Sequence, residues 1–155
     1  MESARLACKQ DTSVLGDLAV EAREEMRTKR GGDVLDRLDT ARDDPKSSME
    51  RIFEAKENVV VLGTIDDVPV GFGFMKVTEV ADGAGHAFLE ILYVDPSGRS
   101  VGVGEAMLGL LIQEAIKRGA VGIEAVALPG DRATKNFFET HGMTARAITV
   151  HRELV

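Results

Sequence analysis

The sequence predicts a mixed α/β fold, in which a mostly antiparallel central sheet carries helices on both faces. Apolar residues recur at three- and four-residue spacing in two long stretches, and this spacing is the period of one helical face. Between them lie consecutive β-branched or alternating stretches separated by turn residues, a pattern typical of an antiparallel meander. The 155 residues are 44% hydrophobic and 29% charged, which suits one domain over residues 1–155 and excludes collagen, coiled coil and wholesale disorder.

The chain is expected to begin with a strand followed at once by a helix. The strand is short and mixed, and covers Arg5 to Lys9. Asp11, Thr12 and Ser13 then offer side-chain oxygens that can cap a helix from Val14 to Lys29. Gly31 and Gly32 are expected to stop this helix.

A polar, helix-prone stretch from Asp33 to Phe53 comes next. Asp44 and Pro45 interrupt it, because proline disfavours helical geometry in the residue before it. We therefore expect one broken helix or two, and the alternating charges from Asp36 to Asp44 indicate a solvated surface.

Three strands are expected in the middle of the chain. They are predicted over the β-branched run Val59–Leu62 and the stretches Val70–Val80 and His86–Val94. Turn residues separate them, at Asp66–Pro69 and at Asp82–Gly85.

The second half of the chain returns to helices. The clearest element is an amphipathic helix from Val103 to Arg118, which ends at Gly119. The remaining elements are expected as a strand at Val121–Leu128, a helix at Asp131–His141 capped by Asp131, and a last strand at Ala145–Arg152.

Charge and cysteine content limit the partners. Nineteen Lys and Arg against twenty-six Asp and Glu give a net charge of -7, so nucleic acid is disfavoured. The single cysteine, Cys8, excludes an internal disulfide, no Cys/His cluster has zinc spacing, and we expect Cys8 to be a small buried residue. The N-terminus has no signal pattern and no apolar run approaches roughly 20 residues, so we expect a cytoplasmic protein with no membrane partner and no metal.

The segment from Leu92 to Ala106 is a strand that runs through a glycine-rich loop into the strongest helix. Unpaired N–H groups at the start of a helix attract anions, and Gly102 and Gly104 allow a ligand close to the backbone. Arg99 adds a charge that can fork onto phosphate oxygens. A Walker-type loop is disfavoured, because the lysine and hydroxyl that it requires are missing.

A dinucleotide fingerprint is also disfavoured. Its first glycine must follow the strand directly, whereas Gly102 lies eight residues after Val94, and Met107 occupies the third glycine position. Only Glu124, about 20 residues further on, favours this alternative. Glycines at a helix start that bind nothing are a further alternative.

Two motifs resemble the GCN5-related N-acetyltransferases. Arg99-x-x-Gly102-x-Gly104, after the strand ending at Val94, is similar to the family's acyl-CoA-binding motif. The segment Asp131 to Met143, with Phe137-Phe138-Glu139 and Gly142-Met143, resembles the family's next helix. The two motifs occur in the family's order, and the expected elements match its fold over almost the whole chain.

The resemblance implies acetyl-CoA as co-substrate. The pyrophosphate would lie on backbone N–H groups of the loop, whose residues are Arg99, Ser100, Val101, Gly102, Val103, Gly104 and Glu105. The pantetheine arm would pair with the strand around Leu92, Tyr93 and Val94. Asp131 stands where the family usually has an asparagine that touches the cofactor, and a carboxylate cannot donate as an amide does.

Acetyl transfer to an amine also needs a base. Glu90 interrupts an apolar strand, and strict alternation would place it on one face with His86, Leu92 and Val94. In the family this position often holds the acid that deprotonates the amine; the alternative is a carboxylate at a solvated edge or in a structural ion pair. The resemblance makes the N–H of Leu92 the oxyanion donor. His86 is expected at the surface, with the role of base as its alternative.

The acid that usually protonates the departing thiolate in this family is missing from the sequence. The family usually has a tyrosine at the position of Phe138. Tyr93 is the only tyrosine, and is expected to face the core, away from Glu90. Thr134 is a weak candidate, and solvent an alternative. His141 is expected to cap its helix, and His151 to be exposed.

The first hypothesis is an acetyl-CoA-dependent N-acetyltransferase that acts on a primary amine of a small molecule or on an exposed amino group. The acidic balance mildly favours a cationic acceptor such as a polyamine or aminoglycoside. The second is a non-catalytic acyl-CoA-binding or sensor module, suggested by Phe138. A nicotinamide-dependent enzyme ranks third. Small domains of this fold often pair, which is compatible with a homodimer.

Overall fold

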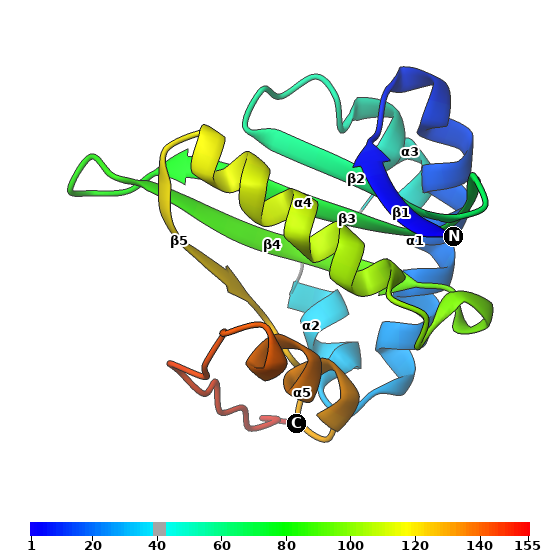
Figure 1. The fold of residues 1–155 in the computed structure, drawn as a ribbon. Coiled ribbons are helices and arrows are strands. Elements are labelled where there is room, and N and C mark those ends of the chain that lie inside the picture. The colour runs from blue at the N-terminus through cyan, green and yellow to red at the C-terminus, as the bar shows by residue number, and fades with distance from the viewer. Residues whose placement is uncertain (39–42) are drawn as a thin grey trace.

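A computed structural model describes residues 1–38 and 43–155 of the chain. Residues 39–42, which belong to the stretch expected to be helical, lie outside the described residues. Figure 1 shows the fold, with its elements in this order along the chain: β1 (Glu2–Leu6), η1 (Lys9–Asp11), α1 (Thr12–Thr28), α2 (Gly32–Leu38), α3 (Pro45–Arg51), β2 (Asn58–Ile65), β3 (Val68–Glu79), β4 (Gly85–Val94), η2 (Pro96–Gly98), α4 (Val103–Lys117), β5 (Ala120–Ala125) and α5 (Arg132–Thr140).

The strands of the described chain form one sheet in the order β1-β2-β3-β4-β5. The first three pairings are antiparallel, and β5 runs parallel to β4. Asp66 and Asp67 both have positive φ, as a tight two-residue hairpin between β2 and β3 requires. The β4–β5 pairing ends at Leu89 and Ala125, where β5 itself ends, and the chain then leaves the sheet toward α5 (Figure 1).

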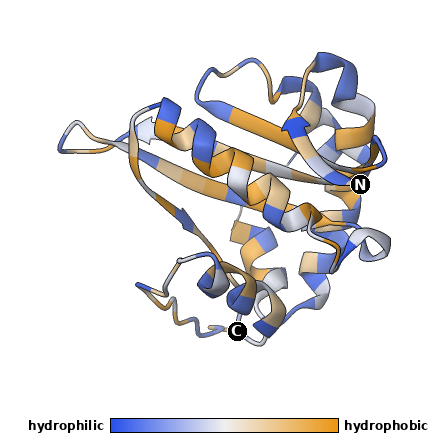
Figure 2. Ribbon diagram, in the orientation of Figure 1, coloured by the Kyte–Doolittle hydropathy of each residue, from blue (hydrophilic) through white to orange (hydrophobic). Residues whose placement is uncertain are grey.

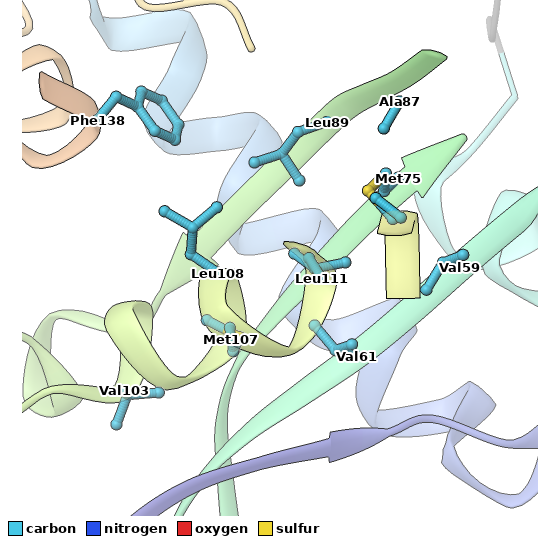
Figure 3. Packing of buried hydrophobic residues seen from close by; sticks show 11 residues of the cluster. Val59, Val61, Met75, Ala87, Leu89, Val103, Met107, Leu108, Leu111 and Phe138 are labelled. Atoms are coloured by element: carbon cyan, nitrogen blue, oxygen red, sulfur yellow. The ribbon is translucent and has the colours of Figure 1, made fainter. Parts of the chain in front are cut away.

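Helices cover both faces of the sheet. On one face, residues of α4 such as Met107, Leu108 and Leu111 are fully buried in a cluster with strand residues, and Phe138 of α5 points toward Leu89 and Leu108 (Figure 3). On the other face, α1 and α3 pack together and contribute to a second cluster around Phe72. Figure 2 shows hydrophobic residues along the central strands and through α4, as expected for elements that share a core.

The structure confirms most of the expected elements. The mixed, mostly antiparallel sheet with helices on both faces is present. The described part of the stretch 33–53 contains two helices, and the second has proline at its first position. The first strand lies at Glu2–Leu6, earlier than expected. No helix in the described ranges is both long and apolar enough to cross a membrane.

The expected strand at Ala145–Arg152 is wrong. Residues 144–155 form no helix or strand, and Ile148 and Val150 are 88% and 89% exposed. Alternating apolar residues form a strand only with a ladder partner and a buried face, and this segment has neither among the described residues. Side-chain ion pairs hold the tail instead, from Arg146 to Glu124 of β5 and from Arg37 of α2 to Glu153.

Cys8 is exposed, against the expectation that it is buried. Its backbone N–H donates to Asp11 at 2.8 Å, and the same carboxylate receives both terminal nitrogens of Arg5 at 2.8 Å. Asp11 stands at the cap position of α1, yet its side chain makes no capping bond to that helix. The hydrogen bonds from Arg5 hold the pKa of Asp11 well below its usual range. Cys8 thus lies beside the charged groups of Arg5 and Asp11, which explains why its side chain stays outside the core.

The glycine at position 63 allows α4 to lie close to the sheet. A Cβ there would lie 2.5 Å from Val103 Cγ1 and 2.9 Å from Met107 Sδ. Both neighbours are buried, so neither can move far. Gly109, in the middle of α4, is different because a Cβ there would meet nothing within 4 Å.

We predict opposite effects for the two alanine substitutions. Gly63→Ala should lower the free energy of unfolding by about 1–3 kcal/mol, because it overfills the contact between α4 and β2. Gly109→Ala should raise it by about 0.5–1 kcal/mol, because alanine favours the helix and meets no neighbour. Urea denaturation followed by circular dichroism measures both. Equal stability of the two variants would contradict the role assigned to Gly63.

Candidate active site

Glu90 lies at an irregularity in β4. Phe74 of β3 pairs with Ile91 and Met75 pairs with Leu89, so Glu90 has no partner across the ladder and forms a bulge. The bulge breaks the alternation that the sequence analysis assumed. Leu92 packs on the α4 side with Leu89, whereas Ile91 packs on the α1 side. The expectation that Glu90, His86, Leu92 and Val94 share one face is therefore wrong.

The Glu90 side chain is exposed. Among residues 1–38 and 43–155 it makes no hydrogen bond or ion pair. The bulge lies one residue beyond Leu89, where the pairing between β4 and β5 ends. A carboxylate thus stands unneutralised at the point where the two parallel strands separate.

The outer edge of β4 is open beyond this point. The N–H of Asp95 donates to Val70 O of β3 at 2.7 Å, so Tyr93, two residues earlier, also directs its backbone toward β3. Leu92 and Val94 therefore direct their N–H and C=O groups away from β3. On that side β5 no longer pairs with β4. The Val94 carbonyl accepts a 2.8 Å hydrogen bond from Arg99 Nε. The N–H groups of Leu92 and Val94 face the open gap.

The loop after β4 presents a series of free N–H groups. Ser100 has φ +66° and Gly102 has φ +96°, and α4 begins at Val103. In the described part of the chain, the backbone N–H groups of residues 100–105 make no hydrogen bond, and the first intrahelical bond comes from Ala106 to Gly102. No side chain caps the helix at Gly102. Free N–H groups at the positive end of a helix dipole form an anion site.

Arg99 is held within the protein. Its Nε donates to Val94 O, a terminal nitrogen lies 2.6 Å from Glu25 of α1, and the guanidinium carbon lies 5.7 Å from the centre of the Tyr93 ring. The side chain was expected to fork onto phosphate oxygens. In the structure it joins the loop to α1 instead.

Two aromatic residues of the candidate set are buried. Tyr93 is 7% exposed, as expected for a core residue, and its hydroxyl donates to Glu21 at 3.4 Å. Burial, together with the charges of Glu21 and Glu25, raises the pKa of Tyr93 to about 12. Phe138 is 9% exposed in the cluster under α4 (Figure 3). Neither side chain offers an acidic proton near the open edge of β4.

Asp131 caps α5. Its Oδ1 accepts from the N–H of Thr134. Its Oδ2 accepts from both the Thr134 hydroxyl and Lys29 Nζ, each at 2.8 Å. Burial alone would raise the pKa of Asp131, but the Lys29 and Thr134 hydrogen bonds outweigh it and leave this pKa below its usual range. Lys29 and Asp131 line an open groove of about 240 Å³ between the end of α1 and the loop before α5. Thr134 is thus committed to the cap.

Two histidines have partners away from the loop, whereas His141 Nε2 lies 3.9 Å from Glu105 at the end of the loop. His86 is half-buried, and its Nε2 lies 3.0 Å from Glu124 of β5. Glu124 also binds Arg146, and the hydrogen bond from Arg146 is the main cause of its lowered pKa. His141 caps α5 as expected, and His151 is exposed as expected.

The structure therefore brings together the bulge, the open edge of β4 and the start of α4. The Phe137 ring packs against the start of α4, because a Cβ at Gly104 would lie 3.5 Å from that ring. Glu105 is exposed, and Val101 is 50% exposed. Sequence reasoning missed Glu25 and Lys29 of α1. Their four-residue spacing places them on one helical face, but it gives no sign of their distant partners.

No group of three or more His, Cys, Asp or Glu side chains within the described ranges could hold a metal ion. The chemical groups that the site offers are a free carboxylate, two strand N–H groups and the N–H groups of a helix start.

Comparisons with known proteins show the family and the fold. The family model for the acetyltransferase (GNAT) family matches residues 21–143. No curated protein matches the chain significantly.

Three solved structures are similar over their full length. A tetramutant protein from Bacillus halodurans aligns with a TM-score of 0.81 and 17% identity, covering 97% of this chain and 99% of that one. Ribosomal-protein-alanine N-acetyltransferase from Brucella melitensis biovar Abortus has a TM-score of 0.74, 14% identity and coverages of 99% and 100%. The aminoglycoside N-acetyltransferase AAC(6')-Iy in complex with CoA has a TM-score of 0.75, 16% identity and coverages of 100% and 96%. At these identities the likeness concerns the fold.

The single tyrosine allows a direct test of the environment at the end of β4. We predict that the phenol absorbance of the native protein titrates with a pKa of about 12, against roughly 10 for the unfolded chain. Because the folded pKa is raised, the stability that it contributes is complete below the unfolded pKa and is lost as the pH rises through the folded value. Spectrophotometric titration with and without urea measures both; identical curves would contradict the burial of Tyr93.

Proposed function

The chain belongs to the acetyltransferase (GNAT) family, and we propose that it transfers the acetyl group of acetyl-CoA to a primary amine of a small molecule or to an exposed amino group. The single observation that carries this proposal is the run of free N–H groups at residues 100–105, next to the open edge of β4. The first feature suits a diphosphate, and the second suits an extended chain with amide groups.

The loop is the proposed site of the pyrophosphate. Positive φ at Ser100 and Gly102 turns successive N–H groups toward one side, and the dipole of α4 favours negative charge there. The backbone of residues 100–105 provides these contacts. Arg99 was expected to contribute its N–H as well, but this group donates to Pro96 O, and its side chain braces the loop. Phosphate recognition by backbone is compatible with a net charge of -7, because the N–H groups act only at short range.

The pantetheine arm is proposed to occupy the gap beside Leu92, Tyr93 and Val94. The N–H groups of Leu92 and Val94 point into that gap, as a new strand would require. Phe138 of α5, which packs in the same cluster as Leu92 and Val94, borders the other side, and Asp131 caps the start of α5. In this arrangement the thioester carbonyl lies near the N–H of Leu92, which stabilises the oxyanion that forms during transfer.

Glu90 is the proposed base. An alkyl ammonium has a pKa of about 10.4, so its proton must be removed before its nitrogen can attack. Glu90 takes this proton, and the nitrogen forms a bond to the carbonyl carbon. The C–S bond then breaks with its electron pair on sulfur, and the nitrogen loses its second proton to water. The support for this role is that Glu90 is exposed at the strand separation and makes no ion pair within the described residues.

The departing thiolate is proposed to take its proton from solvent. Tyr93 is buried with a raised pKa, and Phe138 has no proton to give. A thiol has a pKa of roughly 8.5, so the thiolate is a tolerable leaving group near neutral pH.

The net charge of the chain and the names of similar solved structures support a cationic amine as the acceptor. AAC(6')-Iy is an aminoglycoside N-acetyltransferase, and the Brucella protein is a ribosomal-protein-alanine N-acetyltransferase. The net charge of -7 and the free carboxylate of Glu90 favour an amine that arrives as a cation. Binding without transfer, as in a sensor module, is the second candidate, and the missing tyrosine at Phe138 is the observation that favours it.

We predict that Glu90→Gln lowers kcat by about 100-fold or more, because the amine keeps its proton. Its affinity for CoA should stay within about twofold of the wild type, because the amide keeps the shape of the side chain. A panel of primary amines with acetyl-CoA, followed by thiol release, gives the rate, and calorimetry gives the affinity.

Glu79→Gln is the matched control, since Glu79 is also an exposed carboxylate of the sheet, at the far end of β3. It should leave both quantities unchanged. An unchanged rate in Glu90→Gln would remove Glu90 from the mechanism. CoA binding with no acceptor found for the wild type would favour the sensor module, and no CoA binding at all would overturn the proposed function.

A further inference from the structure

One face of α1 makes polar contacts with the elements that surround the candidate site. Glu21, Glu25 and Lys29 follow each other at four-residue spacing, which places them on one side of the helix or its end. They contact, in the same order, Tyr93 of β4, Arg99 of the loop and Asp131 at the start of α5. The face of α1 thus extends from the end of β4 to the cap of α5.

The second of these contacts, between Glu25 and Arg99, lies next to a residue with a strained backbone. Ser100 has φ +66°, in the left-handed region that residues with a side chain rarely adopt. Such a conformation persists only when the surrounding structure holds it. In this loop the strain has a consequence for binding, because Ser100 opens the run of free N–H groups at residues 100–105.

Arg99, the residue immediately before Ser100, is fixed at several points. Its Nε is hydrogen bonded to Val94 O, and its guanidinium lies beside the Tyr93 ring. Glu25 supplies the negative charge, at 2.6 Å, and the two side chains are 41% and 29% exposed for Arg99 and Glu25. Without Glu25, the Arg99 side chain keeps, among the described residues, one hydrogen bond to a carbonyl, a ring contact and the electrostatic attraction of Asp95.

We propose that Glu25 is a positioning residue for coenzyme binding: by fixing Arg99, it holds Ser100 in the conformation that exposes the N–H groups of the loop. This inference rests on the proposed function, because it assigns those N–H groups to the pyrophosphate. Glu25 itself does not touch the coenzyme. It acts through Arg99 and the backbone.

The sign of the effect separates this role from two others. Removal of a negative charge near an anion site strengthens anion binding, because it removes a Coulomb repulsion. Release of Arg99 from a competing carboxylate would also strengthen it, because the free guanidinium could bind phosphate. A positioning role predicts the opposite, weaker binding, because the loop loses the conformation that presents its N–H groups.

The test compares CoA affinity by calorimetry in the wild type and Glu25→Gln. We expect Glu25→Gln to bind CoA about fivefold more weakly, the size that a partly exposed ion pair supports. With an acceptor amine, the KM for acetyl-CoA should rise by the same factor while kcat is unchanged. Arg99→Lys should also weaken binding, because lysine keeps the charge but cannot bridge Val94 O and Glu25.

Two further variants complete the design. Glu24→Gln removes the same charge from the neighbouring, exposed position of α1 and should leave CoA affinity unchanged. Ser100→Gly in the Glu25→Gln background should return the affinity to within about twofold of the wild type, because glycine adopts positive φ without strain. A merely structural defect of α1 would not be rescued by a change in the loop.

Each outcome has a defined meaning. Tighter or unchanged CoA binding in Glu25→Gln would overturn the positioning role while leaving the proposed function intact. Weaker binding that Ser100→Gly does not rescue would also overturn it. Failure of the wild type to bind CoA would instead contradict the proposed function, before any variant is considered.

Discussion

The separation of β5 from β4 is the constraint on which the site depends. Where the two strands pair, β5 occupies the outer edge of β4, so a ligand strand cannot pair there. After Leu89 the parallel ladder ends, and at Glu90 the ladder with β3 slips by one residue. The bulge therefore coincides with the start of the open edge. One local irregularity both exposes a carboxylate and determines which residues beyond it face α4.

The helices α4 and α1 lie on opposite faces of the sheet, and both contact the region at the end of β4. On one face, Gly63 allows α4 to lie close to the sheet. A short loop connects the end of β4 to the first turn of α4. On the other, α1 contacts the same region through side-chain ion pairs. The core holds the elements in place mainly through apolar contacts, whereas polar contacts set the conformation of the loop. Packing thus fixes distances, and charge pairing fixes the orientation of the backbone.

Patterns that are local in the sequence predicted the fold well. The spacing of Met107, Leu108 and Leu111 predicted α4, and the Asp66–Asp67 turn predicted the hairpin. Strict alternation failed at Glu90, because a bulge depends on the pairing with β3 and leaves no mark on the strand itself. It failed again at Ile148 and Val150, because alternation does not show whether a strand has a partner. The contact between Glu25 and Arg99 joins residues 74 positions apart, so only the folded chain reveals it.

The free side of β5 has a consequence for how the molecule behaves in a crowded solution. In the described chain β5 has no strand beyond it, and Val121 is 79% exposed there. An unpaired edge is a template on which strands of other molecules can assemble. Two features oppose this: β5 has only 6 residues, and the ion pair between Glu124 and Arg146 fastens the tail beside it. The shortness of β5 and the ion pair that ties the irregular C-terminal segment to it therefore both limit assembly at this edge.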